Sequence, residues 1–186
     1  MKRLFDVALA LGTTVSLVLP ILVIALAIRL TSPGPVLYWS DRVGRHNRIF
    51  KMPKFRSMRE STPTLATHLL TDPEYWITPL GAFLRKYSLD ELPQVWSILK
   101  GDMSFVGPRP VLSSETELLK LRSEHGLDTL SPGLTGWAQV NGRDKLNDQE
   151  KLQYDLDYMR NWSICFDTRI IIITFLKVLT KDGVSH

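Results

Sequence analysis

The longest apolar pattern in the chain covers residues 7–28, which contain no charged side chain. As a continuous helix this run would extend for roughly 33 Å at about 1.5 Å per residue, which is enough to cross a bilayer. The residues that follow it, RLTSP at positions 29–33, offer no small-residue cleavage site. The pattern therefore predicts a retained membrane helix rather than a cleaved signal peptide.

Basic residues flank this run on both sides, and both flanks therefore favour the cytoplasm. Lys2 and Arg3 precede the run, whereas a series of arginines and lysines from Arg29 to Arg59 follows it. Pro20 lies in the middle, where it frees a backbone carbonyl and can bend the helix. A re-entrant helix that enters, bends and returns satisfies both basic clusters, and a single-pass anchor with a proline kink is the alternative.

Shorter periodic segments predict the elements of the remaining domain. The breaker residues 32–35 (SPGP) end the apolar run, and the short stretches 36–39 and 48–52 predict a small β-hairpin. Residues 61–76 lack sustained periodicity and contain two prolines, which predicts a loop. Residues 131–143, with glycines at positions 133, 136 and 142, are expected to form a second loop. Start and stop signals predict helices at Thr78-Pro79 through Arg85, from Ser114-x-x-Glu117 to Gly126, from Asn147-x-x-Glu150 through Asn161, and over the apolar run 170–179 with Asp167 as N-cap.

Two of these predicted helices carry further expectations. The acids of the helix that starts at Asn147, among them Asp155 and Asp157, are predicted to form a solvated face. The aromatic and cationic residues around the C-terminal apolar run suit a membrane surface, and core packing is an equal alternative. The whole pattern predicts one anchored, mostly helical α+β domain without internal repeats.

Composition and charge narrow the classes of partner. A chain of 186 residues with 44% hydrophobic and 23% charged residues is typical of a folded domain with an appendage. The net charge of +4 favours anionic partners, which include nucleotides, nucleic acids and membrane lipid. Cys165 is the only cysteine, so an intramolecular disulfide and a cysteine-based zinc site are excluded.

Candidate chemistry centres on residues 88–110, SLDELPQVWSILKGDMSFVGPRP. Asp90 and Glu91 lie at the start of a short apolar segment. Ser88 and Glu91 have the spacing of a helix capping box, which is the structural alternative to a functional role. Pro93 disfavours a regular helix start at this point. An irregular cap beside two acids and a glycine-rich loop favours a functional site.

Three further segments supply candidate ligands for phosphate. Arg109 lies between two prolines after Gly107, which predicts a fixed guanidinium fork, with a solvated surface turn as the alternative. Trp137 and Arg143 lie in a second glycine-rich segment, where they offer a stacking surface for a base and another fork; core or interface packing of Trp137 is the alternative. Lys54 and Arg56 predict either half of a diphosphate pocket or a patch attracted to anionic lipid, and both roles can hold at once.

Residues 54–58, 88–110 and 131–143 together closely resemble the bacterial sugar transferases, and among them the monotopic polyprenyl-phosphate phosphoglycosyl transferases. The likeness covers almost the whole chain, from Lys2-Arg3-x-x-Asp6 through Gly183-Val184, and it is to the small members that consist of the catalytic domain alone. The resemblance implies a re-entrant membrane helix over residues 1–30, bent at Pro20. It also implies a catalytic domain over residues 31–186, with interfacial helices, on the cytoplasmic face of the cell inner membrane.

The resemblance further implies a reaction between a UDP-sugar and polyprenyl (undecaprenyl) phosphate, giving polyprenyl-diphospho-sugar and UMP. Such a reaction is the first membrane step of glycoconjugate and polysaccharide assembly, and an N-acetylated amino-deoxy sugar is expected from the small members. Asp90 matches the family's nucleophile, which forms a covalent aspartyl-phosphosugar, and Glu91 matches its partner in the dyad. Arg85, Arg109 and Arg143 match positions that hold phosphates, and the family uses Mg²⁺, for which Asp90 is the expected ligand.

This chemistry is consistent on physical grounds. A diphosphate brings negative charge to a carboxylate nucleophile, so a hard divalent cation with oxygen ligands is needed to neutralise it. Guanidinium forks then hold the transferring group in line. Asp90 near a helix N-terminus is expected to stay ionised, as an attacking carboxylate must.

Two positions depart from the pattern of the relatives. Leu19 precedes Pro20 where many relatives have serine, so help from a serine hydroxyl in bending the helix is absent. Ser40 replaces a frequent glutamine ahead of Arg42 and Gly44.

Rival functions follow from the same residues. A membrane-anchored basic protein that binds lipid or a partner without catalysis would need no metal and would tolerate loss of the Asp90 carboxylate. A magnesium-dependent hydrolase of nucleotide sugars would need no lipid acceptor. Nucleic acid is not an expected partner, because the cations cluster beside a membrane segment and the aromatic residues form no stacking array. The oligomeric state is open.

Overall fold

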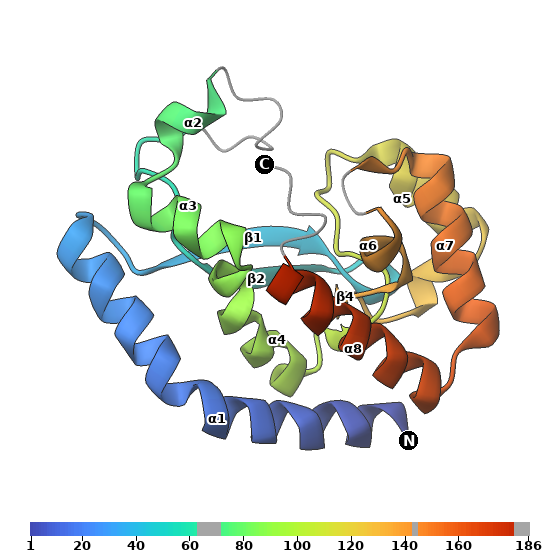
Figure 1. Cartoon of the computed structure of the whole chain (residues 1–186). Coiled ribbons are helices and arrows are strands. Elements are labelled where there is room, and N and C mark those ends of the chain that lie inside the picture. The colour runs from blue at the N-terminus through green and yellow to red at the C-terminus, as the bar shows by residue number, and fades with distance from the viewer. Residues whose placement is uncertain (63–71, 143–144, 181–186) are drawn as a thin grey trace.

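The computed structural model describes residues 1–62, 72–142 and 145–180, in which helices surround two small sheets (Figure 1). This confirms a mostly helical α+β fold. In chain order the helices (α), 3-10 helices (η) and strands (β) are α1 (Lys2–Thr31), β1 (Leu37–Val43), η1 (Arg45–Asn47), β2 (Ile49–Phe55), α2 (Pro73–Trp76), α3 (Pro79–Lys86), η3 (Leu89–Gln94), α4 (Val95–Lys100), β3 (Ser104–Val106), α5 (Thr116–Glu124), η4 (Leu127–Thr129), β4 (Gly133–Thr135), α6 (Trp137–Asn141), α7 (Asp148–Asn161) and α8 (Ile164–Thr180).

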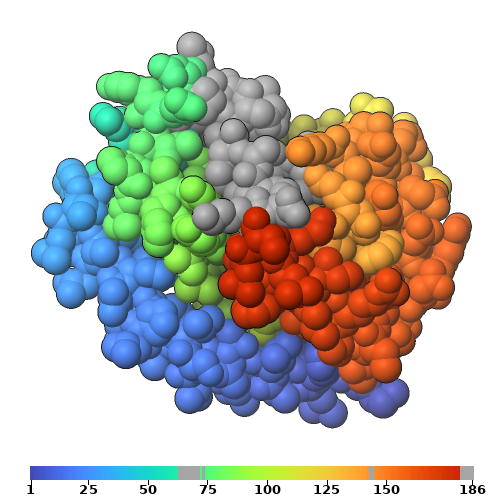
Figure 2. All heavy atoms as spheres, viewed as in Figure 1, coloured from blue at the N-terminus to red at the C-terminus, as the bar shows by residue number. Residues whose placement is uncertain are grey.

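Helix α1 is continuous through Pro20 and bends in its middle (Figure 1). It ends at the predicted breaker, where Ser32 takes an extended conformation. Within the part of the chain that the structure describes, α1 is the one helix long and apolar enough to cross a membrane, and only 6% of its apolar window is buried. In the space-filling view α1 forms the lower edge of the molecule, below α8 (Figure 2).

Polar contacts attach the N-terminal turns of α1 to the domain. Lys2 Nζ lies 2.6 Å from the fully buried Asp167 carboxylate of α8. Arg3 donates to the carbonyls of Ile98 and Leu99 at the end of α4. The buried Asp6 carboxylate belongs to the same anchor, because it accepts bonds from the β3 residues Ser104 and Phe105.

Apolar packing attaches the C-terminal half of α1 to the same domain. Ile28 is buried against Phe55 of β2 and Leu84 of α3. The Arg56 guanidinium, which follows β2, donates to the Ser32 carbonyl at the end of the helix over 2.8 Å. Both ends of α1 therefore contact one domain, with the exposed apolar residues of the helix between and around these contacts.

The predicted β-hairpin is confirmed. Strands β1 and β2 pair antiparallel with Leu37 opposite Phe55 and Val43 opposite Ile49. His46 and Asn47 take positive φ angles at the turn between the strands. The turn contacts η4 through a bond from Arg45 Nε to the Thr129 carbonyl, which attaches the tip of the hairpin to the far side of the domain.

A second, parallel sheet formed by β3 and β4 was not predicted, and neither was α6. Ser104 pairs with Gly133, and Val106 pairs with Thr135. The segment 131–143 was expected to be a loop, and that prediction is wrong for β4 and α6. A Cβ on Gly133 would lie 2.2 Å from the Gly107 nitrogen, so glycine is required where the two segments pass backbone against backbone.

Local capping signals predicted some helix starts and missed others. Thr78 Oγ1 accepts from the Gly81 nitrogen, and Asn147 and Glu150 form the predicted capping box. The Ser114 capping box is wrong, because α5 begins after Glu115, whose carboxylate instead accepts from the Leu112 nitrogen. The predicted loop 61–76 contains the short helix α2, and residues 63–71 lie outside the described part of the chain.

Two acids occupy environments that their sequence positions did not predict. Asp167 is not the N-cap of α8: the helix begins at Ile164, and Ser163 Oγ accepts from the Phe166 nitrogen. Asp167 instead accepts a bond from the buried Tyr158 hydroxyl as well as from Lys2. Asp155 is 1% exposed and does not belong to a solvated face.

The core lies between the hairpin, the parallel strands and helices α4, α7 and α8. Ile98, Val106 and Ile170 are fully buried in it. Helix α8 packs into this core on one face, while Ile172, Phe175, Leu176 and Leu179 are exposed on another. Core packing of the C-terminal helix is therefore confirmed for one face, and a membrane contact of its exposed face stays a prediction.

We expect Asp6→Ala to lower the free energy of unfolding by about 2 kcal/mol, because the Ser104 hydroxyl and the Phe105 amide would lose their buried acceptor. Denaturant unfolding in detergent micelles, followed by tryptophan fluorescence, measures this change. Asp41→Ala is the matched control, since Asp41 is 62% exposed and lies 3.6 Å from Lys51; it is expected to change stability by less than about 0.5 kcal/mol. Equal losses in the two variants would contradict a buried anchor at Asp6.

Candidate active site

Asp90 and Glu91 lie in η3, an irregular 3-10 helix of six residues that leads into α4. Ser88 takes a left-handed conformation with φ of 53°, and its side chain caps no backbone amide. The capping-box alternative is therefore wrong. Pro93 lies inside this 3-10 helix. Both acids are nevertheless buried, at 8% and 9% exposed. Two buried carboxylates on adjacent residues need positive charge nearby.

Basic side chains from two segments distant in the sequence lie beside the Glu91 carboxylate. Lys54 Nζ of β2 lies 2.9 Å from Glu91 Oε1, and both side chains are largely buried. Arg109 Nη2, in the loop after β3, lies 3.7 Å from the same oxygen. The structure thus brings together three of the predicted site residues from β2, η3 and the proline-flanked loop.

Asp90 has a different electrostatic environment from its neighbour. Burial is the main cause that raises the pKa of Asp90, and repulsion from the Glu91 carboxylate adds to it. Lys54 and Arg85 act in the opposite direction and lower this pKa, although less strongly. Burial and Glu91 thus act against ionisation of Asp90, and η3 is a 3-10 helix of only six residues, so its dipole offers little compensation. Asp90 therefore gains from any further positive charge.

The loop that carries Arg109 is held by its carbonyl groups. The carbonyls of residues 108–111 accept bonds in turn from the Gly133 nitrogen, Arg122 Nη1, Arg42 Nη1 and the Val43 nitrogen. The distances are 2.8, 2.8, 3.5 and 2.9 Å. Because proline has no N–H, acceptor contacts are the main way to fix this stretch.

Arg42 is a site residue that the sequence analysis did not select. Its Nε donates to the buried Ser40 hydroxyl over 3.0 Å, and its Nη1 lies 3.5 Å from the Pro110 carbonyl. Burial, followed by repulsion from Arg109, lowers the pKa of Arg42. The available signal was the strand period of two, which places Ser40 and Arg42 on the same face of β1. The Ser40 hydroxyl therefore orients this guanidinium.

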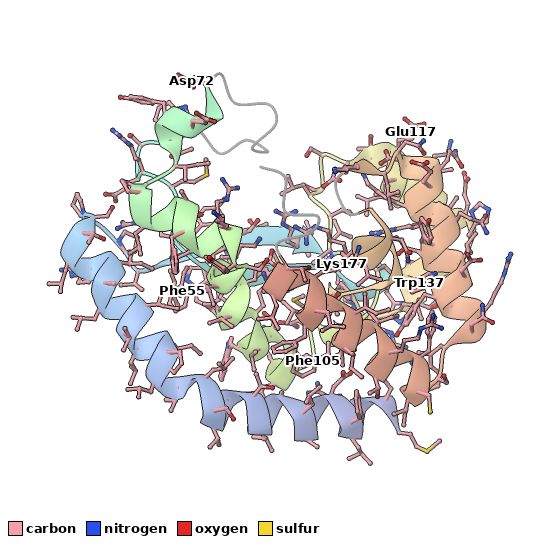
Figure 3. The ribbon with its side chains drawn as sticks, in the orientation of Figure 1. Phe55, Asp72, Phe105, Glu117, Trp137 and Lys177 are labelled. Atoms are coloured by element: carbon pink, nitrogen blue, oxygen red, sulfur yellow. The ribbon has the colours of Figure 1, made fainter. Side chains whose placement is uncertain are left out.

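The remaining predicted residues have separate placements. Arg85 of α3 acts electrostatically on Asp90, as its effect on that carboxyl shows. Arg56 is buried at the end of α1 and bonds to the Ser32 carbonyl. Trp137, labelled in Figure 3, packs edge-on against Phe166 at 5.1 Å and also contacts Tyr154. The indole thus has the packing that was the alternative to a base-stacking surface, and Arg143 lies outside the described residues.

The arrangement favours chemistry on a phosphate. Glu91 neutralises part of the charge of Lys54 and Arg109 and keeps both cations beside Asp90. Guanidinium and ammonium groups suit phosphate oxygens, and a carboxylate among them can act as a nucleophile or a metal ligand. Among the residues that the structure describes, no three His, Cys, Asp or Glu side chains gather into a metal cluster. Magnesium needs only one or two carboxylates when substrate phosphates supply other ligands, so the dyad fits this ion.

Comparison with known proteins gives a consistent set of relatives. The family model described as bacterial sugar transferase matches residues 1–181. EpsL of Bacillus subtilis (strain 168), named a sugar transferase, is 38% identical over 186 residues, which cover 100% of this chain and 91% of EpsL. The UDP-glucose:undecaprenyl-phosphate glucose-1-phosphate transferase of Xanthomonas campestris pv. campestris is 42% identical over 96% of this chain. The undecaprenyl-phosphate galactose phosphotransferase of Salmonella typhimurium (strain LT2) is 38% identical over 98% of it.

The coverage of these relatives differs. The chain spans nearly all of EpsL, but only 38% of the Xanthomonas protein and 41% of the Salmonella protein. The family match over residues 1–181 extends across the candidate site.

We expect Asp90→Asn to stabilise the folded protein at pH 7 without metal. The folded-state pKa of Asp90 is raised, so its ionisation costs stability as the pH rises through that pKa, and an amide removes this cost. The melting temperature at pH 7 is therefore expected to rise. At pH values below about 3.9, where aspartate is protonated in both states, the difference is expected to disappear. Differential scanning fluorimetry of wild type and variant, at pH 7 and at low pH with a chelator present, measures both differences in melting temperature.

Glu91→Gln is the matched control for this prediction. It leaves Lys54 and Arg109 without their shared carboxylate, so the melting temperature at pH 7 is expected to fall. A loss of stability in Asp90→Asn at neutral pH would show that Asp90 is a structural ion-pair partner.

Proposed function

The chain belongs to the bacterial sugar transferase family, and from this membership we propose that it transfers a phospho-sugar from a UDP-sugar to polyprenyl (undecaprenyl) phosphate. The products are polyprenyl-diphospho-sugar and UMP. The observation that carries the proposal is the buried Asp90–Glu91 pair with Lys54, Arg85 and Arg109 around it. The names of the Xanthomonas and Salmonella relatives describe sugar phosphate transfer to the same lipid carrier.

We propose that Asp90 is the nucleophile of a two-step transfer. An Asp90 carboxylate oxygen attacks the β-phosphorus of the UDP-sugar, and the bond from that phosphorus to the bridging oxygen breaks. UMP leaves with the bridging oxygen and its electron pair. A phosphate oxygen of polyprenyl phosphate then attacks the same phosphorus and releases the Asp90 carboxylate.

The two acids have separate roles in this mechanism. Glu91 is occupied by Lys54 and Arg109, and it holds these cations where they can receive the diphosphate oxygens. Burial and the neighbouring Glu91 raise the pKa of Asp90, so its carboxylate, once ionised, is basic enough to act as a nucleophile. Arg85 lies on the Asp90 side and supports the ionised form that attack requires.

We propose Mg²⁺ as the cofactor, with Asp90 as its protein ligand. The raised pKa of Asp90 fits a position that takes up a cation, since positive charge would offset its burial. When bound, the ion neutralises the negative charge of the diphosphate. Arg109 and Lys54 act on the remaining phosphate oxygens.

The sugar is the least constrained part of the proposal. Resemblance to the small members of the family supports an N-acetylated amino-deoxy sugar. The relatives are named for glucose and galactose. A panel of UDP-glucose, UDP-galactose, UDP-GlcNAc and UDP-N-acetylated amino-deoxy sugars, with polyprenyl phosphate and UMP release as the readout, distinguishes these donors.

We also propose that α1 is re-entrant and places the domain on the cytoplasmic face of the inner membrane. Its two ends contact one domain through Asp6 and Ile28, its exposed surface is apolar, and its flanks are basic. Pro20 lacks the N–H that would bond to the Ser16 carbonyl, which supports the bend in the helix.

Mixing the enzyme with magnesium and UDP-sugar in the absence of lipid is expected to give an aspartyl-phosphosugar adduct on Asp90 together with UMP. Intact-protein mass spectrometry followed by peptide mapping detects and locates the adduct. Steady-state kinetics with both substrates are expected to be ping-pong. Asp90→Asn is expected to abolish the adduct and turnover, and Asp102→Asn is the matched control, because Asp102 pairs with Lys100 in the next loop.

Different outcomes separate the rival functions. UMP release that always requires the lipid, without any adduct, would favour direct transfer in a ternary complex with Asp90 as a metal ligand only. Release of sugar phosphate to water would indicate a hydrolase. Lipid binding without turnover of any donor, unchanged in Asp90→Asn, would indicate the non-catalytic binding protein.

For the topology, we expect both ends of α1 to resist labelling from outside intact cells. A single cysteine in a short extension ahead of Met1, or at the exposed Leu30, in a Cys165→Ser background reports each end. Positions in the extension avoid Lys2, whose bond to Asp167 anchors the helix. A membrane-impermeant maleimide labels both sites only after lysis if the helix is re-entrant. Labelling of the extension in intact cells would establish a spanning helix.

A further inference from the structure

We propose that Arg122 and Asp155 form a positioning pair that fixes the Arg109 guanidinium at the phosphate site. Neither residue belongs to the dyad or to the basic residues that surround it. The inference rests on the proposed function, because it assigns Arg109 to the substrate phosphates. It adds a second layer of residues, on α5 and α7, on which the transfer would depend.

The loop that carries Arg109, residues 108–111, has few backbone donors that could fix it in place. In residues 108–110 (PRP) only Arg109 has an N–H, so the backbone can be fixed mainly through its carbonyl oxygens. The Pro108 carbonyl bonds to the backbone of Gly133 and the Val111 carbonyl bonds to the backbone of Val43. Between these backbone contacts two side chains donate to the loop: Arg122 to the Arg109 carbonyl over 2.8 Å, and Arg42 to the Pro110 carbonyl over the longer distance of 3.5 Å.

The Arg122 guanidinium is oriented so that it can bond to Asp155 and to the Arg109 carbonyl at the same time. Its Nε and Nη2 donate to Asp155 Oδ2 over 3.0 and 2.7 Å, which fixes the plane of the group. Nη1 then points to the Arg109 carbonyl. Arg122 is 8% exposed and Asp155 is 1% exposed, so neither side chain reorients freely in solvent. A lysine could not supply three donors in one rigid plane.

Packing alone does not account for a charged pair at this position. Leu127, Leu152 and Leu156 form an apolar cluster between α7 and η4, with Leu121 of α5 packed against it. Burial raises the pKa of Asp155 even though Arg122 acts to lower it, which shows that burying this carboxylate carries a cost. Apolar residues in place of a buried ion pair are often neutral or stabilising. The bond to the Arg109 carbonyl gives the pair a use that apolar residues cannot provide.

A small displacement of Arg109 would matter for transfer. Its Nη2 lies 3.7 Å from Glu91 Oε1, so the guanidinium borders the dyad without a tight bond to it. Its position is therefore set by the backbone that carries it, and misplacement of a positioning group by about 1 Å can cost a rate factor near 10². Loss of the bond from Arg122 to the Arg109 carbonyl is therefore expected to lower kcat strongly and to change the melting temperature only slightly.

The test compares Arg122→Lys and Asp155→Asn with the wild-type full-length protein. Arg122→Lys keeps a positive charge opposite Asp155 but cannot also hold the Arg109 carbonyl. Asp155→Asn keeps the shape but weakens the anchor of Arg122, and it serves if the first variant fails to fold. Leu152→Ala is the matched control, because it loosens the apolar cluster beside the pair and leaves the three guanidinium bonds in place.

With the donor of the panel that gives the highest wild-type turnover, Arg122→Lys is expected to lower kcat by about 10- to 100-fold. Leu152→Ala is expected to lower the melting temperature at least as much as Arg122→Lys does. Its kcat is nevertheless expected to change less than about twofold. A double-mutant cycle with Arg109→Lys is expected to be non-additive, since Arg122 acts only through Arg109. Additive effects on kcat in this cycle would show that Arg122 and Asp155 only stabilise the fold. Equal losses of kcat in Arg122→Lys and Leu152→Ala would show the same.

A measurement that does not need turnover separates this inference from the proposed function. Hydrogen exchange of the Gly133 and Val43 amides, which donate to the Pro108 and Val111 carbonyls of the loop, is read by mass spectrometry of the peptides that contain them. It is expected to accelerate at least tenfold in Arg122→Lys and to stay unchanged in Leu152→Ala. Unchanged exchange in Arg122→Lys overturns the positioning role even if the wild type is active. Absence of UMP release from every donor in the wild type overturns the proposed function instead.

Discussion

The Glu91 carboxylate is the interaction on which the site depends, because distant segments of the chain meet at it. Lys54 comes from the hairpin and Arg109 from the loop after β3, and both approach the same oxygen. A buried acid with these cations can stay charged, and it keeps the cations beside Asp90. The hairpin, the 3-10 turn and the proline-flanked loop are thereby fixed relative to one another.

Asp90 and Glu91 are adjacent in the chain but have different charged neighbours. Glu91 is surrounded by its cations, whereas burial and Glu91 itself raise the pKa of Asp90. Environments that separate two neighbouring carboxyl groups in this way are typical of sites where they do different work. The structure supports a division in which one acid organises the cations and the other reacts.

Helix α1 is joined to the same framework at both of its ends. Asp6 bonds to β3, which leads directly into the Arg109 loop, and Ile28 packs on Phe55 at the end of β2, next to Lys54. The membrane segment and the site therefore share their supporting strands. This arrangement makes the placement of the domain at a membrane and the geometry of the site parts of one structure.

Features encoded by short stretches of sequence could be predicted. The apolar run, its end at residues 32–35, the hairpin, the capped starts at Thr78 and Asn147 and the irregular turn at Asp90 each depend on neighbouring residues. The parallel pair of β3 and β4, the burial of Asp155 and Asp167, the contact of Arg56 with α1 and the role of Arg42 depend on partners far along the chain. Arg122 and Asp155 are 33 residues apart, and Lys2 and Asp167 are 165 apart. Local patterns indicate propensity and periodicity. Only the tertiary structure decides which buried charges are paired, because burying a charge is costly unless an oppositely charged or hydrogen-bonding partner lies beside it.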